Sequence, residues 1–329
     1  MFRAAGTNWE FRHHPLLPNG HMQTFAGLYL PRNEAPYRAT KHKVELADGD
    51  TLVVHEDLPA GWTAGQANVL LIHGLAGCYL STYMCRMTDR LLAAGYGVYR
   101  LDMRGCGAGE GLARYSTHCN RWEDAAAALK FIAQRQPQSA TALVGYSMGG
   151  AIGLNLLAQS GNTRIGNLHR TLAICPPIDL FDIERRFDQP LGRPYDRFFV
   201  RMLWQQIINR WHRFPDLAPN QIPRRRPRRL RQIDQLVTVP LGGYETVESY
   251  YRDAAPGPKL ASIRQPATIL AAANDPIVPS EPLNQYPCST NVETVVTPSG
   301  GHLGFIARRT TDPDRRWLDW RILDWLQQS

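Results

Sequence analysis

The chain has 329 residues and a formal net charge of +8, with 43% hydrophobic and 20% charged residues. This composition is typical of a globular protein, and the length allows one large α/β domain with insertions or two small domains. The longest apolar runs, such as residues 69–72 and 125–129, are far shorter than the roughly 20 residues of a membrane-spanning helix, so no such helix is expected.

The first 20 residues contain charges and a tryptophan, where a secretory signal needs an unbroken apolar stretch of about 7 to 15 residues. The six cysteines are scattered, with no C-x-x-C motif and no spacing typical of a zinc site. We therefore predict free thiols in a reducing compartment, as in a cytoplasmic protein.

Residues 1–39 are predicted to form an irregular N-terminal arm, which contains the segments HHPLLP and NGHMQT. The pattern then changes to a hairpin over residues 42–56, followed by alternating strands and helices. Strands are predicted at residues 68–74, 97–102, 141–146, 170–175, 267–273 and 291–296. Helices are predicted at residues 82–94, 121–134, 148–159 and 245–252, around residue 280, and at residues 315–328.

Short, wholly apolar strands separated by helices indicate a parallel sheet covered on both faces. The predicted fold class is α/β, with a mostly parallel, doubly wound sheet in one domain over residues 40–329. The alternation is interrupted over about residues 176–240, where the chain is aromatic and arginine-rich. We predict a helical cap inserted there, over the strand ends where ligands of open α/β sheets bind.

The stretch LVGYSMGG, residues 143–150, joins a predicted strand to a predicted helix at Ser147. Gly145 and Gly149 complete a G-x-S-x-G pattern, which a sharp strand-to-helix turn requires because side chains two residues on either side of the serine would collide. Such a turn raises the hydroxyl above the sheet and leaves the amide of Met148 free at a helix N-terminus. Ser147 is therefore the predicted nucleophile.

A serine hydroxyl needs a base to take its proton and a carboxylate to orient that base. In this type of sheet the chain order is serine, acid, histidine. Asp275 and His302 each follow one of two successive predicted strands, so both are expected at the edge where Ser147 lies. Asp275 is the predicted acid and His302 the predicted base. Asp179, after the strand that ends at residue 175, is the alternative acid.

The segment HGLAG, residues 73–77, follows the first parallel strand, and its glycines allow the backbone to approach a substrate closely. We predict an oxyanion hole formed by the amides of Leu75 and Met148, with His73 organising the loop rather than acting as a base. The glycine-rich stretch DMRGCGAGEG matches no dinucleotide pattern, and no Gly-Lys-Ser/Thr motif occurs. No cofactor or metal is predicted, and these glycines are assigned to a loop at the rim of the site.

The stretch PRRRPRRLRQ, residues 223–232, contains six arginines. Such a run can attract nucleic acid or an anionic membrane surface, but it lacks interleaved aromatic side chains that stack on bases. We favour a solvated loop, expect no nucleic-acid partner, and keep peripheral contact with an anionic membrane open.

A predicted helix before this run has apolar side chains that suit either an acyl pocket or core packing. These side chains are Phe198, Phe199, Leu203, Trp204, Ile207, Ile208 and Trp211.

The order Ser147, Asp275, His302 on such a sheet resembles the α/β-hydrolase superfamily over about residues 40–328. The segments NGHMQT, HGLAG, RGCG and GYSMGG are similar to a narrower branch, the YheT-like proteins related to animal ABHD1/ABHD3-type hydrolases and fungal medium-chain ethyl-ester synthases. The resemblance implies a serine carboxylic-ester hydrolase or an acyltransferase acting on small-molecule or lipid acyl esters, with a phospholipase or lipase as one alternative.

A non-catalytic binding protein on the same fold is a further alternative, but such a protein is expected to lack a member of the triad. The segment NGHMQT receives no catalytic role, only a turn at Asn19 and Gly20. The oligomeric state is left open.

Overall fold

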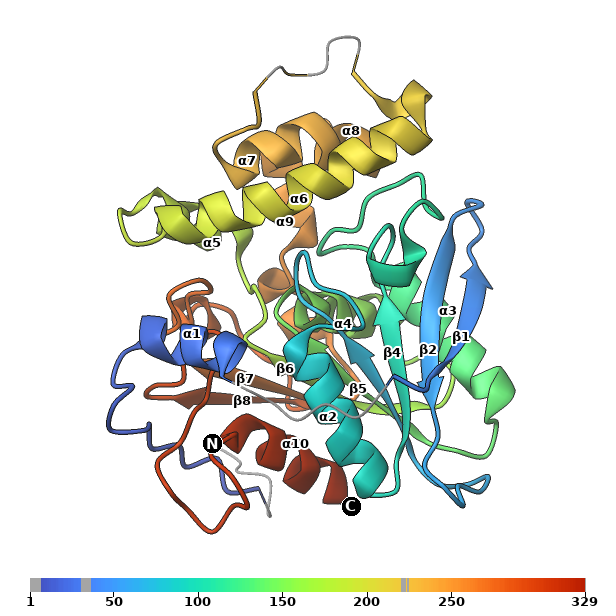
Figure 1. The fold of residues 1–329 in the computed structure, drawn as a ribbon, viewed down its shortest axis with the longest axis vertical. Coiled ribbons are helices and arrows are strands. Elements are labelled where there is room, and N and C mark those ends of the chain that lie inside the picture. Colours follow the sequence, from blue (N-terminus) through green and yellow to red (C-terminus); the bar gives the residue numbers. More distant parts are fainter. Residues whose placement is uncertain (1–6, 31–36, 220–222, 224, 329) are drawn as a thin grey trace.

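A central sheet organises the computed structural model, which describes residues 7–30, 37–219, 223 and 225–328 (Figure 1). Within these residues eight strands pair in the order β1-β2-β4-β3-β5-β6-β7-β8. Strand β2 is antiparallel to β1 and β4, and the other neighbours are parallel. The strands are β1 Thr40–Glu45, β2 Thr51–Asp57, β3 Asn68–Ile72, β4 Gly97–Asp102, β5 Thr141–Tyr146, β6 Leu168–Ile174, β7 Ala267–Ala272 and β8 Val292–Thr297. The predicted fold class is confirmed.

Helices cover both faces of this sheet. The helices of the described chain are α1 Gly20–Tyr29, α2 Thr82–Ala93, α3 Trp122–Arg135, α4 Met148–Ser160, α5 Leu180–Asp188, α6 Arg193–Arg213, α7 Leu230–Ile233, α8 Val239–Gly242, α9 Val247–Ala254 and α10 Trp317–Gln327. In β3, Val69 and Leu71 pack with α2 and α10, whereas Leu70 and Ile72 pack with α3 and α4. This two-residue alternation places a separate apolar core on each face.

Two local predictions are wrong. The segment around residue 280 forms only a short 3₁₀ turn, Glu281–Asn284, because Pro279 and Pro287 bound it closely. The N-terminal arm is not irregular throughout, because α1 is a helix. Asn19, predicted in a turn, is its N-cap, and the Asn19 side chain accepts a hydrogen bond of 2.9 Å from the amide of Met22.

Helices α5 to α8 come between β6 and β7 and lie over one end of the sheet (Figure 1). Helices α6 to α8 share a small core in which Ile207 and Trp211 of α6 pack with Ile233 and Val237. A second cluster joins this cap to the loop after β7, because Phe187 and Tyr195 pack against Ile277 and Val278. No helix in the described part of the chain combines the length and the apolar character needed to cross a membrane.

Candidate active site

Ser147 occupies a sharp turn between β5 and α4, with φ of 52° and ψ of −119°. A Cβ atom on Gly145 would lie 2.4 Å from the carbonyl oxygen of Gly149, and one on Gly149 would lie 2.4 Å from that of Ile72. Both contacts are closer than packed atoms tolerate, so glycine is required at both positions. The amide of Ser147 donates to the Ile174 carbonyl at 2.8 Å, which ties the turn to β6.

The structure brings the three predicted side chains together. Nε2 of His302 lies 3.0 Å from Oγ of Ser147, and Nδ1 of His302 lies 2.7 Å from Oδ2 of Asp275. Oδ1 of Asp275 accepts hydrogen bonds from the amides of Ile277 and Val278, at 2.8 and 2.9 Å. The carboxylate is therefore fixed on one side and faces the imidazole on the other.

Asp179, the alternative acid, has other partners. Its side chain caps α5 by accepting a hydrogen bond from the amide of Phe181, and it also accepts one from the hydroxyl of Tyr286, both at 2.8 Å. Asp275, and not Asp179, therefore faces His302.

The two residues with the predicted oxyanion amides line the same cavity as Ser147. Met148 is the first residue of α4, and Leu75 lies in the loop after β3. Within the described chain neither amide donates a hydrogen bond to another protein group. Gly74 packs against the serine so closely that a Cβ there would lie 3.2 Å from Cβ of Ser147. Two free amides beside a serine hydroxyl can stabilise a negative oxygen that develops there.

His73 holds the loop that carries Leu75. Its Nδ1 lies 2.8 Å from the Gly74 carbonyl oxygen, and its Nε2 accepts a hydrogen bond of 3.4 Å from the amide of Met103. Burial lowers the pKa of His73, which favours the neutral ring that such a pair of bonds requires. These contacts agree with the predicted loop-organising role.

The glycine-rich loop after β4 wraps around a carboxylate of the protein itself. Oδ2 of Asp102 accepts a hydrogen bond of 2.8 Å from the amide of Ala108, and Oδ1 accepts one of 2.7 Å from the amide of Tyr79. A Cβ on Gly107 would lie 2.4 Å from Oδ2. Asp102 therefore links the loops after β3 and β4, and the glycines make room for it.

Helix α1 carries the contacts of the NGHMQT segment, which the sequence left unexplained. Oγ1 of Thr24 accepts a hydrogen bond of 2.9 Å from the backbone amide of His302 and donates one of 2.7 Å to the Gly20 carbonyl. The fully buried amide of Gln23 bonds both backbone groups of Ile306, at 3.1 and 2.7 Å. The segment thus holds the loop on which His302 lies.

Both ends of α1 are attached to other parts of the protein. Nδ1 of His21 lies 2.8 Å from the hydroxyl of Tyr195 on α6. At the other end, the guanidinium of Arg316 donates to the carbonyl oxygens of Gly27 and Leu30, at 2.9 and 3.0 Å. Helix α1 therefore connects the His302 loop with the cap and with the start of α10. The sequence signal was the consecutive polar residues Gln23 and Thr24 soon after an N-capping asparagine.

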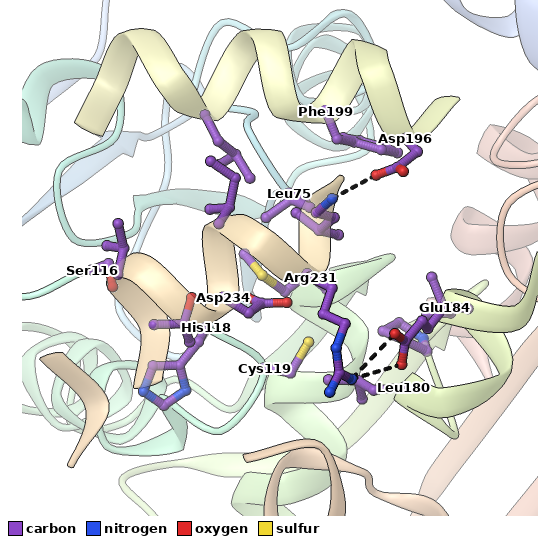
Figure 2. A pocket seen from close by; sticks show the side chains of 18 of the residues that line it. Leu75, Ser116, His118, Cys119, Leu180, Glu184, Asp196, Phe199, Arg231 and Asp234 are labelled. Atoms are coloured by element: carbon purple, nitrogen blue, oxygen red, sulfur yellow. Dashed lines mark hydrogen bonds and ion pairs between the residues drawn. The ribbon is translucent and has the colours of Figure 1, made fainter. Parts of the chain in front are cut away.

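A cavity of about 360 Å³ lies between the cap and the sheet end, and Ser147, Met148 and Leu75 line it (Figure 2). Of the seven apolar residues singled out on α6, the cavity is lined by Phe199, Leu203 and Ile207. Trp204, Ile208 and Trp211 belong to the small core of the cap, and Phe198 is exposed. The helix therefore serves both a pocket and a core.

The arginine run is only partly the solvated loop that we favoured. Arg225, Arg226 and Arg228 are exposed, and Arg224 lies outside the described residues. Two other arginines line the cavity in ion pairs. One, Arg229, lies 3.2 Å from Asp188 and 3.3 Å from Asp196. The other, Arg231, pairs with Glu184, as Figure 2 shows, and with Glu248. The prediction is wrong for these two, because acidic residues of other cap helices face them.

In the described chain, one group of side chains has the spacing of a metal site: ligand atoms of Cys175, Asp275 and His302 lie within 4.8 Å of one another. Burial raises the pKa of the Cys175 thiol well above its usual value, so the thiol is neutral in this structure. The Asp275 and His302 side chains are already engaged with each other. The group does not fit a metal ion.

Comparison with known proteins agrees with the fold. The chain belongs to the α/β hydrolase fold family, whose model matches residues 67–308. It is 27% identical over 310 residues to the putative esterase YheT of Escherichia coli, covering 94% of this chain and 90% of that protein. It is 28% identical over 255 residues to the human phospholipase ABHD3, covering 75% of this chain and 61% of that protein.

Among solved structures, the Pyrococcus furiosus esterase Pf2001 has the same fold, with a TM-score of 0.57 and 17% identity over 99% of this chain and 98% of that one. The resemblance to YheT-like and ABHD3-type proteins is confirmed. The chain is an enzyme of the esterase and lipase type of α/β hydrolases.

Proposed function

We propose that this protein is a serine carboxylic-ester hydrolase that works through a covalent acyl-enzyme. The observation that supports this most directly is the unbroken contact from Ser147 through His302 to Asp275, with distances of 3.0 and 2.7 Å. The order and geometry of these groups suit an activated serine nucleophile. The esterase and phospholipase names of the relatives agree with ester substrates.

In the first half-reaction, Nε2 of His302 takes the hydroxyl proton of Ser147 while Oγ attacks the carbonyl carbon of the ester. The amides of Met148 and Leu75 bind the oxyanion of the tetrahedral intermediate. When the intermediate collapses, the ester C–O bond breaks and protonated His302 gives its proton to the departing alkoxide. The alcohol leaves, and the acyl group stays on Ser147.

In the second half-reaction, His302 takes a proton from water, and the hydroxide attacks the acyl carbonyl carbon. The same two amides bind the second oxyanion. The bond to Oγ of Ser147 then breaks, Ser147 recovers its proton from His302, and a carboxylic acid is released. Throughout, Asp275 keeps the imidazole oriented and stabilises its protonated form. An alcohol in place of water would give a new ester, which is the acyl-transfer alternative.

Apolar side chains in the cavity suit the acyl part of the substrate. Phe199, Leu203 and Ile207 approach from the cap, and Leu180 and Val278 come from outside α6. Burying a chain of methylene groups among such side chains contributes about 0.8 kcal/mol per group. An acyl chain therefore gains binding energy beside the reactive serine.

Substrates presented at an anionic lipid surface are a second candidate, which the outer face of α6 favours. Arg197, Phe198, Arg201 and Met202 are exposed there. Phe25 of α1 is also exposed and lies beside this helix. Basic and large apolar side chains on one face suit contact with anionic lipid headgroups.

Labelling with a fluorophosphonate probe tests the proposal, because the probe reacts only with an activated serine. We expect the wild type and Ser262→Ala, a change at an exposed serine, to be labelled and Ser147→Ala to remain unlabelled. Equal labelling of Ser147→Ala, or none of the wild type, would contradict the proposal. A series of p-nitrophenyl esters then gives the preferred acyl length.

The lipid-surface candidate needs a separate measurement. Hydrolysis of a dispersed ester is compared with and without vesicles that contain an anionic phospholipid. We expect anionic vesicles, but not neutral ones, to raise the activity of the wild type. Arg197→Glu with Arg201→Glu should abolish this increase and leave activity on soluble esters unchanged. Equal response to neutral vesicles would refute an electrostatic contact.

A further inference from the structure

The cavity beside Ser147 contains a buried arginine that has no counter-charge among the described residues. Four arginines line the cavity: Arg104, Arg210, Arg229 and Arg231. Three of them are ion-paired. Arg104 contacts the carboxylates of Asp48, Asp50 and Asp124, at 2.6, 2.6 and 2.9 Å. Arg229 and Arg231 pair with acidic residues of the cap. Arg210 is the cavity arginine that forms no ion pair with a described residue.

Arg210 lies in the last turn of α6 and is only 9% exposed. Its guanidinium packs on the loop after β4, where a Cβ on Gly105 would lie 2.4 Å from Nη2. Gly105 has a φ of 68°, which also favours glycine. Nε of Arg210 is buried without a partner, and no acceptor within the described residues bonds its Nη atoms.

The ionisable groups that act most strongly on Arg210 do not neutralise its charge. Asp50 attracts it from a distance, but the Asp50 carboxylate already binds Arg104 and the amides of Arg114 and Tyr115. The Cys106 thiol is also near, and burial raises its pKa to about 12, so it stays protonated and neutral. The five N–H donors of Arg210 therefore have no acceptor among these neighbours.

Burying most of a guanidinium without acceptors is costly, because the charge has lost much of its water and gained no protein partner among the described residues. Burial lowers the pKa of Arg210, but a guanidinium keeps its proton in proteins. Arginines that serve only the fold of this cap are paired, as Arg229 and Arg231 are. An unpaired one on the wall of the substrate cavity is suited to acceptor oxygens that arrive with the ligand.

We propose that Arg210 forms an anion subsite, so that the preferred substrate is an acyl ester that also carries a carboxylate or phosphate group. Arg210 binds this group through its planar N–H fork while the ester carbonyl reaches Ser147. The inference rests on the proposed esterase function, because it places the anion in the same cavity as the nucleophile. The anion is held unchanged and takes no part in bond breaking.

Matched ester pairs test the subsite and show which half of the substrate carries the anion. The acyl pair is p-nitrophenyl pentanoate and the mono-p-nitrophenyl ester of glutaric acid. The alcohol pair is 1-butyrylglycerol and 1-butyrylglycerol 3-phosphate. We expect the wild type to prefer the anionic member of at least one pair. In Arg210→Met, kcat/KM for that ester should fall about 10- to 100-fold, and for its neutral partner no more than about twofold.

Arg213→Met is the matched control, because Arg213 is exposed on the same helix and its loss changes the net charge equally. It should keep the preference for the anionic ester. Arg210→Lys keeps the charge without the planar fork and should recover part of the preference. Equal loss for both members of each pair, absence of any anionic preference in the wild type, or the same effect from Arg213→Met would overturn the proposal.

A binding measurement separates this subsite from the catalytic proposal. In the inactive Ser147→Ala variant, glutarate or inorganic phosphate should raise the unfolding temperature, and adding Arg210→Met should remove that increase. Without an anion, Arg210→Met should unfold at the same or a higher temperature, because it removes an unpaired buried charge. A lower unfolding temperature together with an unchanged response to both anions would assign Arg210 to the fold alone. Failure of fluorophosphonate labelling would instead refute the catalytic proposal.

Discussion

The floor and the roof of the cavity are built in different ways. The floor consists of loops after β3, β5, β7 and β8, and its polar side chains have close partners: Asp275 contacts two amides and His302, and Thr24 fixes the backbone of His302. The roof consists of α5 to α8, which combine apolar side chains with ion pairs and leave Arg210 unpaired in the described chain. We propose from this difference that the floor provides reactivity and the roof provides selectivity.

The largest effect is expected at the centre of the floor. Ser147→Ala should lower kcat for ester hydrolysis by about 10⁴- to 10⁶-fold, because the nucleophile is lost while the oxyanion amides and the cavity remain. Its unfolding temperature should stay close to that of the wild type. Steady-state kinetics on a short p-nitrophenyl ester measure the first quantity, and a thermal melt measures the second. If Ser147→Ala retained a tenth of the wild-type kcat, the assignment of reactivity to the floor would be contradicted.

The contact between α1 and the floor gives a smaller effect. Thr24→Val removes the acceptor of the His302 amide, so kcat should fall about 10- to 100-fold and the free energy of unfolding by about 1–3 kcal/mol. KM for a neutral ester should change little, since Thr24 does not line the cavity.

Thr24→Ser keeps the hydroxyl and serves as the control, with nearly wild-type kcat expected. If Thr24→Val lost stability but kept its kcat, α1 would support the fold without positioning His302.

Shortening an apolar side chain of the roof should change the preference for acyl-chain length and leave the reactivity of the serine unchanged. Leu203→Ala enlarges the cavity beside the acyl site, so the ratio of kcat/KM for a long to a short p-nitrophenyl ester should rise about tenfold. The rate of fluorophosphonate labelling should stay within about twofold, because the floor is untouched. Met202→Ala, at an exposed neighbour on the same helix, should leave the ratio unchanged. A similar fall in kcat/KM for esters of all chain lengths would mean that the cap helices of the roof also position the reactive groups of the floor.

The smallest effect concerns a buried carboxyl of the roof. Burial raises the pKa of Asp234 from 3.8 to about 7, and hydrogen bonds from Thr238 and Tyr251 oppose that rise. In the unfolded chain this carboxyl ionises near pH 4, whereas in the folded protein it keeps its proton to about pH 7. Its contribution to stability is therefore present below pH 4 and is lost as the pH rises to about 7.

Asp234→Asn removes that titration, while its side-chain oxygen can still accept from one hydroxyl group and its Nδ2 can donate to the oxygen of the other. The unfolding temperature of the variant relative to the wild type should therefore rise by a few degrees between pH 4 and pH 7. Thermal melts across this range measure it. A constant difference between the two proteins would show that Asp234 does not titrate there.

Local sequence patterns predicted much of the floor. Apolar strands, the glycines at 145 and 149, and the order Ser147, Asp275, His302 are all readable one segment at a time, because the geometry of a parallel sheet brings successive strand ends to one edge. The role of α1 was missed because its buried face is made of Gly20 and Gln23 rather than a stripe of apolar side chains.

By itself, the sequence determined the fold class, the turn that carries the serine and the identity of its two partners. These depend on residue spacing and on steric limits that act within a few residues. Only the tertiary structure decided that Thr24 supports His302, that Arg229 and Arg231 are paired, and that Arg210 has no counter-charge within the described chain. Such contacts join segments far apart in the chain, and their partners are selected by packing rather than by any local pattern.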